Sequence, residues 1–138
     1  MKVEEAFQKV TDEGISKKSA EVRRIRDIAV GKIVRQGDIY AHRVNGTHPM
    51  GEALQTRQLA VGVTQGSRHM AESKPTVKIY AGKKLPEWCA EGTFLGPVIV
   101  ATERFTITHP EHAHIELPAG CFQITHQMDA RTLDRVRD

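Results

Sequence analysis

The fold is decided by one stretch near the C-terminus, which reads Phe105-Thr-Ile-Thr-His-Pro-Glu-His-Ala-His-Ile-Glu-Leu-Pro-Ala-Gly120 and continues as Cys121-Phe-Gln-Ile-Thr-His-Gln-Met128. Apolar and polar side chains alternate on either side of a histidine-rich turn, and a Pro-Ala-Gly turn precedes a third alternating segment. Alternation with a period of two places one set of side chains on each face of a sheet. The stretch therefore predicts three successive strands joined by turns.

Similar short segments recur upstream. Asn45-Gly46 is a strong turn signal, and the unbroken apolar run Val98-Ile-Val100 is typical of a strand that is covered on both faces. About seven or eight short strands at regular spacing predict a mainly β domain, either an antiparallel sandwich, a jelly roll or a small barrel. The upstream strands are predicted in Ile33–Val44 (strand, Gln-Gly-Asp turn, strand), Arg57–Thr64, Thr76–Tyr80 and Thr93–Ala101.

The N-terminal residues have helical rather than alternating periodicity. A first helix face with i, i+3, i+4, i+7 spacing is formed by Val3, Ala6, Phe7 and Val10. A second helix is predicted from a serine cap at Ser16 or Ser19 to Ala29. The predicted organisation is a helical arm over 1–30, a β-domain over 31–128 and a charged tail over 129–138.

One face of the predicted second helix is basic. It is either a solvated surface or an interface for an acidic partner, and the candidate interface residues are Lys17, Arg23, Arg24 and Arg26. Glu21 and Asp27 interrupt the basic face, and no aromatic stacking platform accompanies it. These features argue against a nucleic-acid partner.

Composition places the chain among ordinary globular proteins, with 39% hydrophobic and 27% charged residues and a formal net charge of +3. No apolar run is long enough to span a bilayer, and the N-terminus lacks the apolar region of a secretory signal. We therefore expect no membrane partner and a location in the cytoplasm, or in the virion if the protein is phage-encoded. Cys89 and Cys121 lack metal-ligand spacing and indicate two reduced thiols, or one disulfide in an oxidising compartment.

The histidine-rich turn is the main candidate site. Imidazole and carboxylate groups are suitable ligands for zinc, iron, manganese or nickel. In a strand, His112 and His114 would project to the same side. His109 and Glu111 could complete a cluster, with His69 as the most plausible distant partner and His42 and His48 as further candidates. The alternative is a structural cluster in which these histidines only hydrogen-bond the loop.

No other residue pattern identifies a reaction. A cupin enzyme would show a His-x-His doublet followed by Glu in its first segment, and here the doublet comes late. The carboxylates of Glu103, Glu111 and Glu116 show no catalytic spacing. His126 shares an apolar face with Phe122, which is typical of a core or interface histidine.

Three motifs occur in a fixed order: Gln36-Gly-Asp38 at a strand, Gly66-Ser-Arg-His69 at a turn, and His109-Pro-Glu-His112 with Leu117-Pro-Ala-Gly120 in a terminal hairpin. In this order they resemble a widespread group of small uncharacterised β-proteins of phages and bacteria, over roughly Val34–Met128. The resemblance implies a β-domain and no particular activity.

Because no committed catalytic set is present, we expect a non-enzymatic β-module rather than an enzyme. It would act through protein–protein assembly, as a homo-oligomer or in a larger complex, for example as a phage-type virion accessory or decoration protein. The alternative is a cupin-like enzyme or sensor that binds one transition metal through His69, His109 and His112. The metal would activate water or bind a small acid.

Overall fold

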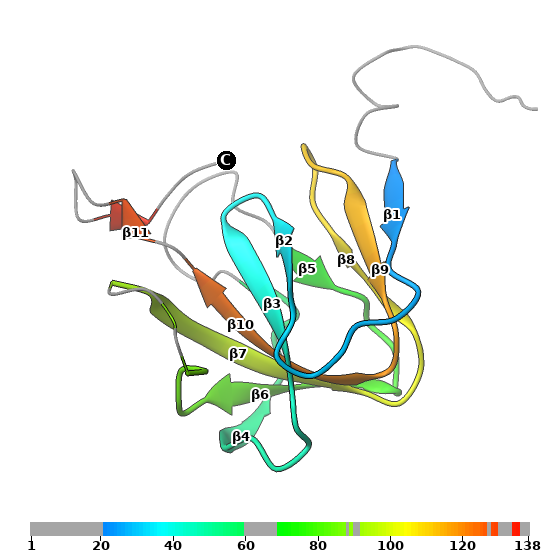
Figure 1. The fold of residues 1–138 in the computed structure, drawn as a ribbon. Helices are drawn as coiled ribbons and strands as arrows, with labels where there is room; N and C mark the ends of the chain where they lie inside the picture. The colour runs from blue at the N-terminus through cyan, green and yellow to red at the C-terminus, as the bar shows by residue number, and fades with distance from the viewer. Residues whose placement is uncertain are drawn as a thin grey trace, which may run out of the picture.

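The structure is a computed structural model that describes residues 21–59, 69–87, 89, 92–126, 128–129 and 134–135. It is a mainly β fold in which two open sheets face each other (Figure 1). The four-stranded sheet has the order β1 (Val22–Arg24), β9 (His114–Leu117), β8 (Phe105–Thr108), β5 (Met70–Ala71). The six-stranded sheet has the order β2 (Ile33–Gln36), β3 (Ile39–Val44), β10 (Gly120–His126), β7 (Phe94–Ala101), β6 (Val77–Gly82), β4 (Met50–Leu54). A separate pair joins β11 (Met128–Asp129) to β12 (Asp134–Arg135).

The three strands predicted around the histidine-rich turn are present, but they belong to different sheets. β8 and β9 form an antiparallel hairpin, whereas β10 lies between β3 and β7 in the other sheet. The Pro-Ala-Gly turn therefore carries the chain from one sheet to the other. Gly120 has a φ of 153°, and a Cβ there would lie 2.7 Å from Cζ of Arg43, so the crossing point requires glycine.

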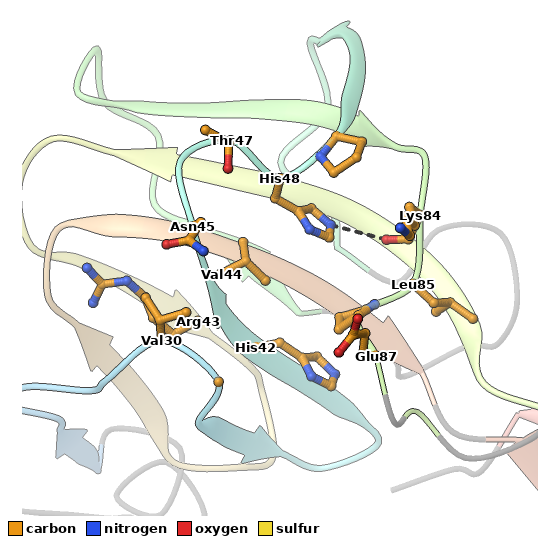
Figure 2. A pocket seen from close by; sticks show the side chains of 13 residues that line it. Val30, His42, Arg43, Val44, Asn45, Thr47, His48, Lys84, Leu85 and Glu87 are labelled. Atoms are coloured by element: carbon orange, nitrogen blue, oxygen red, sulfur yellow. Dashed lines mark hydrogen bonds between the residues drawn. The ribbon is translucent and has the colours of Figure 1, made fainter.

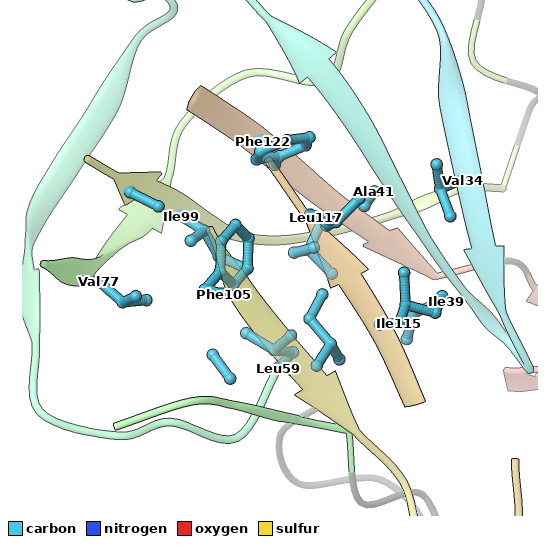
Figure 3. Packing of buried hydrophobic residues seen from close by; sticks show 14 of the residues in the cluster. Val34, Ile39, Ala41, Leu59, Val77, Ile99, Phe105, Ile115, Leu117 and Phe122 are labelled. Atoms are coloured by element: carbon cyan, nitrogen blue, oxygen red, sulfur yellow. The ribbon is translucent and has the colours of Figure 1, made fainter. Parts of the chain in front are cut away.

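The core fills the space between the sheets (Figure 3). Alternate residues of β8, β9 and β10 face inward, and the rings of Phe105 and Phe122 meet edge to face with centroids 5.7 Å apart. Val98 and Ile99 are both fully buried, which agrees with the prediction of a strand covered on both faces. The sheets are thus held by aliphatic packing between alternating faces, as the sequence pattern indicates.

The prediction of helix up to Ala29 is wrong in its described part. Residues 22–24 form β1, which pairs in parallel with β9, and the flanking backbone bonds run from His114 N to Glu21 O and from Ile25 N to Glu116 O. An open sheet edge offers backbone partners along a whole strand, and here they outweigh the helical propensity of the segment.

The described part of the chain contains no helix that is long and apolar enough to cross a membrane. The first predicted helix and both serine caps lie outside the described residues.

Two strands, β4 and β5, lie outside the segments for which the sequence predicted strands. β4 covers a segment with two exposed and three half-buried residues and β5 has only two residues, so neither shows a clear alternation of buried and exposed positions. In the predicted strand Arg57–Thr64, the described residues form only an isolated bridge between Gln58 and Met70. The remainder of that prediction lies outside the described residues.

Gly82 gives a direct test of this sheet geometry. A Cβ at this position would overlap the carbonyl oxygen of Gly96 and lie 2.9 Å from Cγ of Leu95. Gly82→Ala should therefore lower the free energy of unfolding by about 2 kcal/mol or more, because the overlap with backbone forces β6 and β7 apart. Gly46→Ala is the matched control, since nothing lies within 4 Å of its added Cβ. Equal denaturant midpoints for the two variants would contradict the predicted packing.

Candidate functional site

The predicted distant histidine, His69, lies at the centre of a buried polar network. Its side chain is fully buried just before β5. Nδ1 lies 2.7 Å from Oε1 of Gln36, and Nε2 lies 2.8 Å from Oδ1 of Asp38. Gln36 is the last residue of β2 and Asp38 lies in the turn that follows it, so the network joins the two sheets at one end of the fold.

Hydrogen bonding to Gln36 fixes the orientation of this network. The amide nitrogen of Gln36 donates to the carbonyl oxygens of Ile107, at 3.0 Å, and Ala113, at 2.9 Å. Its Oε1 is therefore the acceptor, and Nδ1 of His69 must donate to it. The bond between Nε2 and Asp38 then requires a further proton, carried either by the imidazole or by the carboxyl group. Both ring nitrogens of His69 are occupied in either case.

Two other predicted histidines extend from His69 in a stack of tilted rings, in which His109 contacts His69 and His112 contacts His109. The ring centroids of His69 and His109 are 4.4 Å apart, and those of His109 and His112 are 4.7 Å apart. Nδ1 of His109 accepts the backbone N–H groups of Glu111, at 3.0 Å, and His112, at 3.2 Å. The lone pair of that nitrogen therefore closes the turn that follows β8. Three of the four predicted residues converge, as neighbours in a stack that also stabilises the loop.

His114 lies elsewhere. It begins β9, where Ile115 and Leu117 face the core, so alternation places His114 and Glu116 on the opposite face. His112 precedes the strand, and the two-residue rule that predicted convergence with His114 does not apply to a turn. Within the described part of the chain, no group of three or more histidine, cysteine, aspartate or glutamate side chains is arranged to hold a metal ion.

His42 and His48 form a second pair on the outer face of the six-stranded sheet. Nε2 of His42 lies 2.8 Å from Oγ1 of Thr125, and Nε2 of His48 contacts Oε1 of Gln123 at 2.9 Å. Burial lowers the pKa of His42 below its ordinary value, and the neighbouring His48 lowers that pKa further. His126, at the end of β10, is buried, as expected for a core histidine.

The candidate interface residues lie on a strand and its extension instead of a helix. Arg23, Arg24 and Arg26 are all exposed, while Lys17 lies outside the described residues. Arg24 forms an ion pair with Glu116 across the edge of the sheet, with Nε 3.2 Å from the carboxylate. The three arginines therefore form a basic margin along β1.

Both cysteines are free thiols, with Cys89 half-buried and Cys121 buried. Burial raises the pKa of each thiol, and for Cys121 the neighbouring Arg43 partly opposes the increase. Neither thiol is therefore activated as a nucleophile.

Gln36 and Asp38 are the site residues that the sequence reasoning missed. They were interpreted only as parts of a turn motif. The available signal was alternation, because Gln36 shares the inward face of β2 with Val34 and is 4% exposed. A polar residue at an inward strand position indicates a buried hydrogen-bonding role.

A family model described as a domain of unknown function (DUF8820) matches residues 35–127. The match begins within β2 and includes β10, so it covers the residues of both histidine groups and excludes β1. No curated protein and no solved structure gives a significant match to the chain.

The network around Gln36 predicts a large effect of one substitution. Gln36→Leu removes the partners of two carbonyl groups and of Nδ1 of His69, and we expect the free energy of unfolding to fall by about 3 kcal/mol or more. Gln55→Leu, at an exposed position, is the matched control and should change it by less than about 0.5 kcal/mol. Urea unfolding measures both, and similar values for the two variants would show that the network adds little stability.

His42 predicts a pH dependence. Its folded-state pKa lies below the ordinary value of 6.5, so the unfolded chain binds the proton more readily. The corresponding stability is present above about pH 6.5 and is lost as the pH falls through 6.5 toward the lower folded-state pKa. His42→Gln should therefore lose less stability than the unaltered protein between about pH 7.5 and about pH 5.5 in urea unfolding. His114→Gln is the control, and it should keep the dependence of the unaltered protein.

Proposed function

We propose that the chain, which belongs to the family of the domain of unknown function DUF8820, is a non-enzymatic β-module that acts through protein–protein assembly. We further propose that the segment before the family match, including β1, links one copy to the next. One observation carries the proposal: β1 is added in parallel to the edge of the four-stranded sheet, whereas every other strand pair among the described residues is antiparallel.

β1 is held mainly by its backbone. All three of its side chains are exposed, and Val22 is 54% exposed. The apolar contacts of the segment come after the strand, from the partly buried Ile25 and the buried Ile28. Backbone pairing to β9 depends little on the side chains of the added strand, so the arm of a second copy could form the same hydrogen bonds.

The charges along the edge favour one register for the added strand. Glu116 of β9 pairs with Arg24, and Arg104 donates to the carbonyl oxygens of Ile25 and Arg26. These contacts use groups on the receiving sheet, Glu116 and Arg104, and they would act equally on an arm from another copy. The exposed Arg26 and Asp27 lie between the strand and the anchor at Ile28, where a change of direction would transfer the arm to a neighbour.

A phage-type virion accessory or decoration protein is the specific form of assembly that we propose. The support is the motif resemblance to small β-proteins of phages and bacteria, together with a compact β-domain that carries a charged arm. A cupin-like metal enzyme or sensor has weaker support. His69, His109 and His112 do converge, but the nitrogens of His69 and Nδ1 of His109 already serve the protein's own hydrogen bonds.

Disulfide trapping between separately prepared chains tests the arm. Val22 and His114 are direct partners in the register, so cysteines at these positions lie within bonding range. Two single variants, Val22→Cys and His114→Cys, would be made with Cys89 and Cys121 replaced by serine and then mixed under oxidising conditions. We expect a covalent dimer that contains one chain of each kind, and a light-scattering mass above 15.4 kDa for the unaltered protein.

The control mixture pairs Val22→Cys with Glu52→Cys, an exposed position on β4 of the other sheet, and should give much less mixed dimer. The proposal fails if the protein stays at 15.4 kDa at high concentration and the two mixtures give equal yields. Elemental analysis of the same chelator-free sample addresses the alternative. About one transition-metal equivalent per chain that is lost in a His109→Ala/His112→Ala variant would favour the metal-dependent function.

A further inference from the structure

A cavity of about 310 Å³ opens on the outer face of the six-stranded sheet, on the side opposite the core. Strand β3, the loop 45–49 and the segment 84–87 enclose it, with Val30 and Gly31 at one side (Figure 2). Its volume is at the lower end of the range for small-molecule sites. The lining includes His42 and His48, which the proposed assembly does not use.

His42 provides an unsatisfied polar group in the wall of this cavity. The residue is 6% exposed, and Nε2 is occupied by Oγ1 of Thr125. Nδ1 is buried and has no hydrogen-bond partner among the described residues. A buried polar atom without a partner is costly in a folded protein and is a common sign of a bound group.

His48 is held in a fixed orientation beside it. Its Nε2 contacts the carbonyl oxygen of Lys84 at 3.1 Å (Figure 2). The same nitrogen contacts Oε1 of Gln123 at 2.9 Å. The amide nitrogen of Gln123 donates to the carbonyl of Gly96, so Oε1 is an acceptor and Nε2 of His48 must donate. Nδ1 of His48 forms no hydrogen bond with a described residue and remains for a ligand.

The charge and the walls of the cavity narrow the class of ligand. Lys84 is exposed and forms no ion pair within the described ranges, whereas the guanidinium of Arg43 is turned away and bonds to the carbonyl of Ile28. Glu87 also lines the cavity and is exposed like Lys84, so solvent screens both charges. The apolar walls come from Val30, Val44 and Leu85. One available cation beside two imidazoles and a short apolar wall matches a small organic anion.

We propose that this cavity binds a small carboxylic acid with a short branched aliphatic chain. The carboxylate would lie near Lys84 and accept hydrogen bonds from Nδ1 of His42 and from Nδ1 of His48 in its imidazolium form, and the chain would pack against Val44 and Leu85. The neutral ring of His42 can supply this bond in the tautomer with its proton on Nδ1, where Nε2 accepts from the hydroxyl group of Thr125. His48 needs a proton on each nitrogen, because its Nε2 already donates to Lys84 and Gln123. An amine of the same shape would lack the attraction to Lys84.

The test follows the imidazole resonances of His42 and His48 by NMR while isovalerate is added to the full chain. We expect saturable shifts at both rings with isovalerate, and none with isoamylamine, which has the same branched chain and the opposite charge. The absence of saturable shifts with isovalerate would overturn the proposal. Equal saturation of these shifts by isoamylamine would show that the cavity does not select a carboxylate, and that result would also overturn the proposal.

Two adjacent lysines provide a matched pair of variants. Lys83 and Lys84 are both exposed, but only Lys84 lines the cavity. Lys84→Ala should weaken isovalerate binding by about fivefold, and Lys83→Ala should leave it unchanged, because a screened ion pair has a modest free energy. Val30→Trp, at an exposed position on the cavity wall, should abolish binding without unfolding the protein. Equal weakening by both lysine variants would show that only general charge attraction is present.

Discussion

The amide of Gln36 is the constraint on which this end of the molecule depends. Its nitrogen is bound to the carbonyl oxygens of Ile107 in β8 and of Ala113 in the turn before β9, while its own strand belongs to the other sheet. With the amide fixed, His69 can meet Gln36 only as a donor, and Asp38 then becomes its second partner. A single orientation therefore sets the relative position of the two sheets, the turn after β8 and the histidine stack.

β2, β8 and β9 were predictable from sequence because their buried and exposed positions alternate. β7 was predictable from its unbroken apolar run, and its central residues are buried on both faces. The convergence of His69 with His109 and His112 was also predictable, because turns and strand ends of a sandwich collect at its ends. Gln36 and Asp38 were missed because a buried network depends on long-range partners, which spacing along one chain does not reveal. β4 and β5 lack a periodic signal altogether.

The error at β1 has a different cause. The segment around Val22 and Ile25 has helical spacing, and a local pattern is all that sequence provides for such an edge strand. The competing structure is stabilised by backbone groups of β9, more than eighty residues later in the chain, as the pairing of Val22 with His114 shows. Hydrogen bonds of the sheet edge outweigh a weak local preference, as tertiary contacts generally do. For the same reason, Arg23, Arg24 and Arg26 lie along an edge strand and its extension and not on the face of a helix.

The position of β10 has a consequence for the kinetics of folding. Its neighbour β7 is nearby in sequence, but its other neighbour, β3, is separated from it by most of the domain, as the pairing of Gln123 with His42 shows. Hairpins such as β8 with β9 can close early, whereas the central pairing of β3 with β10 must await the closure of a long loop. That closure sets the folding rate. Until it occurs, β10 is paired with β7 alone, and Phe122 and Ile124 on its inward face lie beside one neighbouring strand instead of two.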